Sequence, residues 1–251
     1  MKALITGASS GIGRDMARVL SNMGHDLILV ARREDRLIEL KSQLKTDAQI
    51  IVADVSSVEA CIDIYNKVKD ENIDILINNA GFGIFGKFTD IELDKELNMI
   101  DVNIKAVDIL TKLFLKDFKK RNSGYILNVA SSAAFLPGPL LSSYYASKAY
   151  VLRLTEAIYE ELRREKSKVY IGTLCPGPVK TEFDEVANVK FSLKGLTSEY
   201  VAKYAINKMF KRKLVIVPGF IMKCARFLAK IAPSKLVLKI AYNQQHKKGE
   251  K

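Results

Sequence analysis

Short apolar runs alternate with amphipathic stretches along most of the chain. The runs are rich in Val, Ile and Leu, as buried strands of a parallel sheet are. They span residues 2–6, 27–31, 49–53, 73–78, 125–130, 169–175 and 214–217. This continuous alternation predicts an α/β fold: a single doubly wound, Rossmann-like domain with a parallel sheet and helices on both faces. Ligands of such folds bind at the carboxyl ends of the strands.

Two polar residues predict where helices begin. Ser56 with Glu59 has the spacing of a capping box for the helix that follows the third apolar run. Ser198 is placed to open the helix that precedes residues 214–217. Both positions come directly before helical patterns, so we expect the helices to start there.

A glycine-rich turn follows the first apolar run. Residues 2–6 lead into the segment Gly-Ala-Ser-Ser-Gly-Ile-Gly at positions 7–13, and a helical pattern then continues to Gly24. In this context glycines allow a tight turn, and the helix N-terminus offers unpaired N–H groups to phosphate. The spacing differs from the Gly-x-Gly-x-x-Gly fingerprint, so a purely structural turn is the alternative. The context favours a turn that binds pyrophosphate.

A tyrosine and a lysine four residues apart form the second candidate feature. On a helix, Tyr144 and Lys148 share one face, whereas Tyr145 has Ala149 at that spacing. A free phenol has a pKa of about 10. An ammonium about 4 Å away supplies about 4 kcal/mol at an effective dielectric near 20, enough to bring the phenol pKa close to neutrality. We therefore expect Tyr144 to act as a general acid whose pKa is lowered by Lys148.

Six motifs occur together in one order along the chain. They are Thr6-Gly7-x-x-x-Gly11-x-Gly13, Asn78-Asn79-Ala80-Gly81, Asn103, Ser131, Tyr144-x-x-x-Lys148 and Pro176-Gly177-x-Val179-x-Thr181. With these motifs the chain resembles the short-chain dehydrogenase/reductase family over residues 1–217. The resemblance is closest to NADP-preferring members with an extended C-terminus.

The resemblance implies four catalytic residues. Tyr144 would protonate a carbonyl oxygen that Ser131 also holds, while hydride arrives from a nicotinamide. Lys148 would keep the phenol acidic and bind the nicotinamide ribose, and Asn103 would position a proton-relaying water. Ser132 adjoins Ser131 and is the alternative to it, because only the family offset separates them.

The resemblance also implies a dinucleotide site. Its expected residues are Gly7, Ser9, Ser10, Gly11, Ile12, Gly13, Arg32, Arg33, Asp54, Val55, Asn78, Ala80, Gly81, Tyr144, Lys148, Pro176, Gly177, Val179 and Thr181. NADP is expected rather than NAD, because Arg32 and Arg33 stand where an acidic residue would bind the ribose 2′-hydroxyl. Arginine pairs with a 2′-phosphate, which a carboxylate would repel. The alternative is a solvated helix start paired with Glu34 and Asp35, and Ser10 stands where some NADP-binding relatives have a basic residue. Asp54 would contact the adenine, or else simply open a βα loop.

The remaining composition excludes several classes. Cys61, Cys175 and Cys224 have no metal-binding spacing, and neither His25 nor His246 lies near another candidate ligand, so we expect no metal site. A buried small residue is the favoured reading of Cys175. No signal peptide and no run of roughly 18 apolar residues is visible. These features predict a cytoplasmic protein, with peripheral membrane contact as one reading of its C-terminus.

Positive charge is concentrated at the C-terminus. Residues 211–251 contain eleven Lys or Arg and one acidic residue, a net +10 of the formal +12 of the chain. We therefore divide the chain into a catalytic domain, 1–217, and a basic amphipathic helical extension, 218–251, broken at Pro233. Lys223, Arg226 and Lys230 share one helical face. Such a helix could bind an anionic membrane surface or an acidic acyl carrier, or pack on the domain or a second subunit. Nucleic-acid binding is not expected, because no known module accompanies the charge.

The substrate is the least specified part of the prediction. By family position, residues 135–141 and 183–196 border the pocket, and they include Phe183, Val186, Phe191 and Leu193. These side chains favour an apolar ketone or aldehyde, although they could equally be ordinary packing. A 3-oxoacyl-thioester reductase is the alternative enzyme, and a non-catalytic dinucleotide-binding redox sensor or interaction protein is the alternative from another class. By resemblance, a homodimer or homotetramer is expected.

Overall fold

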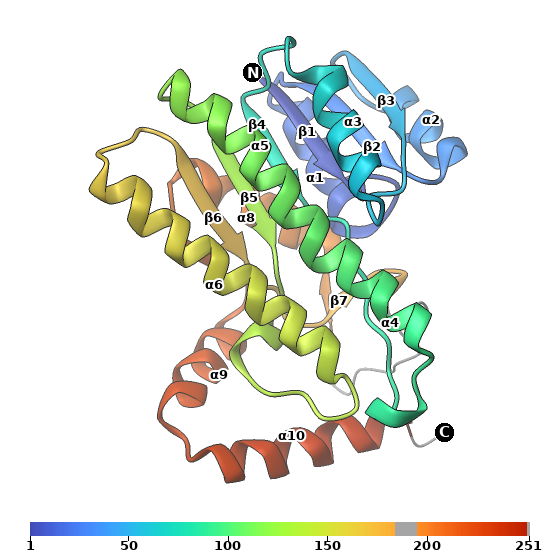
Figure 1. The fold of residues 1–251 in the computed structure, drawn as a ribbon, viewed down its shortest axis with the longest axis vertical. Helices are drawn as coiled ribbons and strands as arrows, with labels where there is room; N and C mark the ends of the chain where they lie inside the picture. Colours follow the sequence, from blue (N-terminus) through green and yellow to red (C-terminus); the bar gives the residue numbers. More distant parts are fainter. Residues whose placement is uncertain (184–194, 250–251) are drawn as a thin grey trace.

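A single twisted sheet forms the centre of the molecule. The computed structural model describes residues 1–183 and 195–249, and in them one parallel sheet has seven strands in the order β3-β2-β1-β4-β5-β6-β9 (Figure 1). The strands are β1 Lys2–Thr6, β2 Asp26–Ala31, β3 Ala48–Val52, β4 Ile75–Asn78, β5 Tyr125–Val129, β6 Tyr170–Leu174 and β9 Val215–Ile216. Each predicted apolar run overlaps one of them, with β2 and β3 each starting one residue before the run, so the predicted doubly wound fold is confirmed. The strand order reverses between β1 and β4, where such sheets bind ligands.

Helices cover both faces of the sheet because neighbouring strand residues point to opposite sides. On β1, Ala3 and Ile5 pack in one core cluster, whereas Leu4 packs in the other. The first cluster includes α1 (Gly11–Asn22), α2 (Glu34–Ser42) and α8 (Ser198–Phe210). The second includes α3 (Val58–Val68), α5 (Ala106–Lys120) and α6 (Ser142–Arg164).

The N-cap of each of the two helices with a predicted start lies one residue away from the predicted serine, although α8 does begin at Ser198. Ser57, not Ser56, caps α3: its Oγ accepts from the Ala60 N–H at 3.1 Å. The reason is that the Ser56 N–H donates to the Asp54 carboxylate at 3.0 Å. This bond keeps Ser56 in the turn that precedes the helix, so the helix begins one residue later. Thr197, not Ser198, caps α8.

Shorter elements shape the end of the sheet where the strands finish. The helix α4 (Leu93–Ile100) continues through a π-helical turn, Asp101–Lys105, into α5. Short 3₁₀ turns span Phe88–Asp90 and Ser132–Phe135, and β7 (Val179–Lys180) pairs with β8 (Leu196–Thr197).

Two helices lie at one end of the molecule, beyond the carboxyl ends of the strands (Figure 1). They are α9, Phe220–Ile231, and α10, Ser234–Gly249, and the break between them falls at Pro233. Among the described residues, no helix is both long enough and apolar enough to cross a bilayer.

Candidate active site

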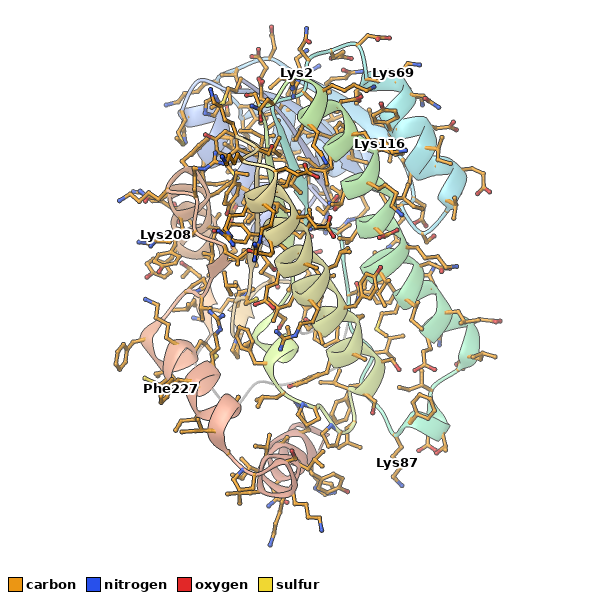
Figure 2. All side chains as sticks on the ribbon, turned by 60° about the vertical axis from the view of Figure 1, so that its left-hand side comes forward. Lys2, Lys69, Lys87, Lys116, Lys208 and Phe227 are labelled. Atoms are coloured by element: carbon orange, nitrogen blue, oxygen red, sulfur yellow. The ribbon has the colours of Figure 1, made fainter. Side chains whose placement is uncertain are left out.

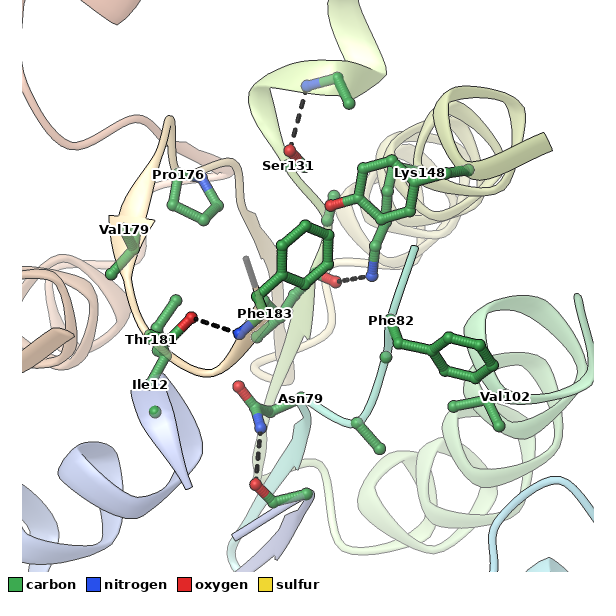
Figure 3. Close-up of a pocket in the computed structure, with 18 of the residues that line it drawn as sticks. Ile12, Asn79, Phe82, Val102, Ser131, Lys148, Pro176, Val179, Thr181 and Phe183 are labelled. Atoms are coloured by element: carbon green, nitrogen blue, oxygen red, sulfur yellow. Dashed lines mark hydrogen bonds between the residues drawn. The ribbon is translucent and has the colours of Figure 1, made fainter. Parts of the chain in front are cut away.

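A cavity of about 960 Å³ opens at the carboxyl ends of the strands (Figure 3). Most of the predicted site residues line it, and they come from loops far apart in the sequence. They are Gly7, Ser9, Ser10, Gly11, Ile12, Arg32, Arg33, Asp54, Val55, Ala80, Gly81, Ser131, Tyr144, Lys148, Pro176, Gly177, Val179 and Thr181. Three predicted residues, Gly13, Asn78 and Asn103, are not among the lining residues.

The glycine turn brings backbone close to the cavity. Gly7 and Gly11 have φ angles of +66° and +52°, in the left-handed region that favours glycine. A Cβ at Gly7 would lie 2.8 Å from the Ala80 Cα, so this crossing of two loops also requires glycine. Ser10, Gly11 and Ile12 line the cavity at the first turn of α1, so the positive end of that helix faces it.

The prediction that Asn78 lines the cofactor site is wrong. Its amide lies 2% exposed inside the fold and donates to Asn128 Oδ1 at 2.9 Å and Thr111 Oγ1 at 3.0 Å. The reason is the alternation of β4, which directs this last strand residue into the layer beneath α5. The neighbouring residue, Asn79, lines the cavity instead.

Asn79 joins the first and fourth strand loops. Its Nδ2 donates to the Thr6 carbonyl at 3.0 Å and to the Gly7 carbonyl at 3.1 Å. A Cβ at Gly13 would lie 2.3 Å from that Nδ2, so Gly13 contributes to the site by leaving room for Asn79 and not by lining the cavity. The sequence analysis missed Asn79, although it stands beside Asn78 in the same motif.

Tyr144 and Lys148 lie on the same face of α6, as predicted from their spacing. The Lys148 Nζ is 5.9 Å from the centroid of the Tyr144 ring and donates to the Val129 carbonyl at 3.1 Å. Burial raises the pKa of the Tyr144 phenol above its ordinary value, while a hydrogen-bond contact with Ser131 acts in the opposite direction. Burial also lowers the pKa of Lys148 to about 8.

The expected lowering of the Tyr144 pKa is therefore wrong. The phenol is buried, and burial penalises its charged form. Tyr144 consequently holds its proton at neutral pH. That is the protonation state of a proton donor.

Ser131 lies two residues after the end of β5 and caps the following 3₁₀ turn, where its Oγ accepts from the Ala133 N–H at 3.1 Å (Figure 3). Ser132 also lines the cavity, and its N–H donates to the Pro176 carbonyl at 2.7 Å. Of these two serines, Ser131 is the one in hydrogen-bond contact with Tyr144.

Asn103 sits in the π-helical turn and is fully buried. Its Oδ1 accepts from the Phe82 N–H at 3.1 Å, and its Nδ2 donates to the Phe82 carbonyl at 2.9 Å and to Ser147 Oγ at 3.0 Å. A Cβ at Gly81 would lie 2.8 Å from Asn103 Oδ1 and 2.9 Å from Lys148 Nζ. Asn103 does not line the cavity itself, but its hydrogen bonds hold the backbone of Phe82 in place beside Lys148.

The two arginines after β2 pair across the cavity, not with Glu34 and Asp35. Arg32 lies 3.5 Å from the Asp54 carboxylate, and Arg33 lies 2.8 Å from the Glu182 carboxylate. Arg33 also donates to Ser9 Oγ at 3.3 Å.

Glu182 is a site residue that the sequence analysis missed. It also binds Arg36, which stands one helical turn after Arg33. Burial acts to raise the pKa of Glu182, but hydrogen bonds from the two arginines outweigh it and the pKa lies below its usual value. No sequence signal marks this pairing, because the partners are 149 positions apart.

The other end of the cavity is apolar. Its lining there includes Phe82, Phe135, Leu136, Leu141, Phe183, Ile221 and Met222. The prediction that Phe183 borders the pocket is thus confirmed, whereas Val186, Phe191 and Leu193 lie outside the described residues. Tyr145 lines this end as well and accepts a hydrogen bond at 2.5 Å from Gln245 of α10.

The cysteines play no visible part in this arrangement. Cys175 is buried beside the Pro176 turn, and burial raises the pKa of its thiol to about 12. Among residues 1–183 and 195–249, no cluster of His, Cys, Asp or Glu could hold a metal ion.

Comparisons with known proteins agree with this geometry. The model of the short chain dehydrogenase family matches residues 1–190. An uncharacterized oxidoreductase of Staphylococcus epidermidis is 38% identical over 185 residues, covering 73% of this chain and 80% of that protein. The human very-long-chain 3-oxoacyl-CoA reductase is 32% identical over 192 residues, covering 73% of this chain and 61% of that protein.

Solved structures give the same result. A short-chain dehydrogenase from Sphingobium yanoikuyae in complex with NADPH superposes with a TM-score of 0.81 at 27% identity, covering 92% of this chain and 96% of that chain. A short-chain dehydrogenase/reductase from Burkholderia phymatum in complex with NAD has the same fold, with a TM-score of 0.83 at 24% identity over 90% of this chain and 92% of that chain. The chain therefore belongs to the short-chain dehydrogenase/reductase family and is an NAD(P)-dependent oxidoreductase.

Proposed function

We propose that the protein is an NADPH-dependent oxidoreductase that transfers a hydride between the nicotinamide and a carbonyl or secondary alcohol group of an apolar ketone or aldehyde. One observation carries this proposal: Ser131, Tyr144 and Lys148 line one cavity that is polar and glycine-rich at one end and apolar at the other. The first end suits a dinucleotide, and the second suits the substrate.

The residues of the polar end fit a dinucleotide. Gly7 and Gly11 let phosphates approach the backbone, and the N-terminus of α1 favours negative charge there. The Pro176–Thr181 segment borders the same cavity on the side of Tyr144. These residues would hold the pyrophosphate and the nicotinamide.

The preference for NADP is supported by Arg32, Arg33 and Ser9. All three line the cavity beyond the ends of β1 and β2, where the adenosine ribose of a dinucleotide would lie. The two guanidinium groups supply positive charge, and Ser9 supplies a hydroxyl beside Arg33. A 2′-phosphate bound there would gain charge-assisted hydrogen bonds that a 2′-hydroxyl lacks.

The proposed mechanism rests on proton transfer from Tyr144. When bound, the reduced nicotinamide supplies the hydride to the carbonyl carbon. Ser131 donates a hydrogen bond to the carbonyl oxygen, and Tyr144, which is protonated at neutral pH, gives that oxygen its proton. Asn103 keeps the backbone at Phe82 in place beside Lys148.

Lys148 stabilises the phenolate that this step creates. The Lys148 Nζ lies 5.9 Å from the centroid of the Tyr144 ring. Opposite unit charges within about 4–6 Å of each other attract by about 3–4 kcal/mol at an effective dielectric near 20. With a pKa of about 8, Lys148 is mostly charged at neutral pH. Its charge therefore lowers the cost of leaving Tyr144 deprotonated in a buried site.

A 3-oxoacyl-thioester reductase is the second candidate. The observation in its favour is the 32% identity to the human very-long-chain 3-oxoacyl-CoA reductase. A non-catalytic redox sensor has less support, because the catalytic side chains are present together and the relatives are named as oxidoreductases. A homodimer or homotetramer in the cytoplasm completes the proposal, and light scattering of the purified protein measures that assembly.

The test is NADPH and NADH oxidation with a panel of aldehydes, ketones, steroids and 3-oxoacyl thioesters. We expect faster turnover with NADPH and an apolar carbonyl compound, and a loss of turnover on the order of a thousandfold in Tyr144→Phe, since general acid catalysis supplies about 10²–10⁴-fold. Tyr145→Phe is the matched control and should keep the NADPH preference. Turnover that survives in Tyr144→Phe would refute the mechanism, and faster turnover with NADH would refute the cofactor assignment.

A further inference from the structure

The two C-terminal helices carry an unusually apolar exposed surface. We call α9 and α10 together the C-terminal platform, and Figure 2 shows Phe227 pointing away from the domain. Large apolar residues on the platform are 42–79% exposed: Phe220, Ile221, Phe227, Leu228, Ile231, Leu236, Leu238, Ile240 and Tyr242. Contiguous apolar patches on a soluble protein mark a surface for a partner or a membrane.

The orientation of α9 is the reverse of an ordinary surface helix. Phe220, Phe227 and Ile231 share one face by their spacing, and that face is exposed. The opposite side carries Met222 and Ala225, which line the cavity. Met222 packs directly on the rest of the molecule, because a Cβ at Gly177 would lie 2.7 Å from its thioether sulfur, Sδ. A surface helix normally exposes its polar face, so the exposed apolar face of α9 needs an apolar medium to cover it.

The charge of the platform indicates what kind of surface could cover its apolar side chains. Residues 218–249 contain no acidic residue. Lys223, Lys235 and Lys239 are exposed among the apolar side chains. Lysines beside exposed aromatic and aliphatic residues match the headgroup region of an anionic bilayer, where the apolar groups enter the acyl boundary and the lysines meet lipid phosphates.

The platform also adjoins the cavity. Ile221 both lines the cavity and is 68% exposed among the apolar residues of α9. On α10, Gln245 lines the cavity and donates to Tyr145. The apolar end of the cavity therefore meets the exposed apolar surface at Ile221.

We propose that the C-terminal platform docks the protein on the surface of an anionic bilayer, with the apolar end of the cavity facing the lipid. Docking follows from the platform alone. The delivery of an apolar carbonyl substrate from the bilayer rests on the proposed function. Phe227 and Ile231 enter the lipid, and Lys235 and Lys239 bind its headgroups.

Vesicle flotation of the full chain tests docking without any substrate. The vesicles contain phosphatidylcholine alone or mixed with phosphatidylglycerol. We expect binding only to the mixed vesicles and weaker binding at high salt. Phe227→Ser and Ile231→Ser should each reduce the partition constant on the order of tenfold, from burial of one large side chain. Lys235→Gln and Lys239→Gln should each reduce it about fivefold.

Matched controls separate docking from general effects on charge and hydrophobicity. Ile38→Ser removes an exposed apolar residue from α2, and Lys116→Gln removes an exposed charge from α5; neither should change binding. Absence of binding to the mixed vesicles, or equal binding by the platform variants, would overturn the proposal. So would a dimer that Phe227→Ser converts to a monomer in light scattering without vesicles, because a second copy would then cover the platform. NADPH oxidation with a water-soluble carbonyl compound should be unchanged in these variants, so docking and catalysis can fail separately.

Discussion

Removing the Glu182 carboxylate should strengthen NADPH binding. In the structure, Glu182 binds Arg33 at 2.8 Å and also binds Arg36, so it holds the guanidinium groups that a 2′-phosphate would need. A phosphate must displace the carboxylate before it can pair with Arg33. In Glu182→Gln, that competition is removed and the local positive charge is no longer neutralised.

The size of the effect follows from the exposure of the pair. The Arg33 and Glu182 side chains are 41% and 34% exposed, so solvent screens their attraction and the pair is worth roughly 0.5–1 kcal/mol. Freeing Arg33 should therefore lower the Kd for NADPH about two- to fivefold. NADH has no 2′-phosphate, so its Kd should stay the same.

Fluorescence titration of both cofactors measures the change. Glu34→Gln removes an exposed carboxylate from the start of α2, which is not paired with Arg33, and controls for net charge. Weaker binding of both cofactors by Glu182→Gln would refute the reasoning, because Glu182 would then secure the loop over either dinucleotide. An equal gain for NADH and NADPH would refute it as well.

Three further variants test the interior of the site. Lys148→Met should abolish turnover yet raise the free energy of unfolding at pH 7 by about 1–3 kcal/mol, because burial lowers the pKa of Lys148 to about 8 and its charge is costly in the fold. Denaturant titrations should show that this stability gain shrinks as the pH rises from about 8 to 10.5. A stability gain that is independent of pH would contradict this explanation. Gly81→Ala places a methyl group 2.8 Å from Asn103 Oδ1 and 2.9 Å from Lys148 Nζ and should reduce kcat on the order of tenfold or more, measured by steady-state NADPH oxidation; an unchanged kcat would show that this close approach is not needed. Asn78→Ala should lower the free energy of unfolding by about 1–3 kcal/mol, because the two buried hydrogen bonds from the Asn78 amide to Asn128 and Thr111 are lost, and cofactor affinity should be preserved. Unaltered stability would show that these two bonds are dispensable.

The sequence predicted the sheet well because each strand leaves a local signal. An apolar run such as residues 125–130 is interpretable without its neighbours, and the structure places β5 within it. Helix starts were less certain, since Ser56 and Ser57 offer the same hydroxyl and only the bond from the Ser56 N–H to Asp54 decides between them.

Site residues that depend on long-range contacts were beyond the sequence pattern. Asn78 and Asn79 are identical in chemistry, and the pleat of β4 alone sends the first inward and the second to the cavity. Glu182 became visible only when the fold brought it to Arg33. The pKa of Tyr144 depends on burial, which a sequence spacing does not report.

The contact of Met222 with Gly177 and the bond from Gln245 to Tyr145 make the C-terminal helices part of the cavity wall. The family match ends at residue 190, before these helices begin. Ser131, Tyr144 and Lys148 thus lie within the family match, whereas part of the wall of the cavity lies outside it. Exchanging the tail between relatives is accordingly a direct route to altered substrate range, with Ser131, Tyr144 and Lys148 left untouched.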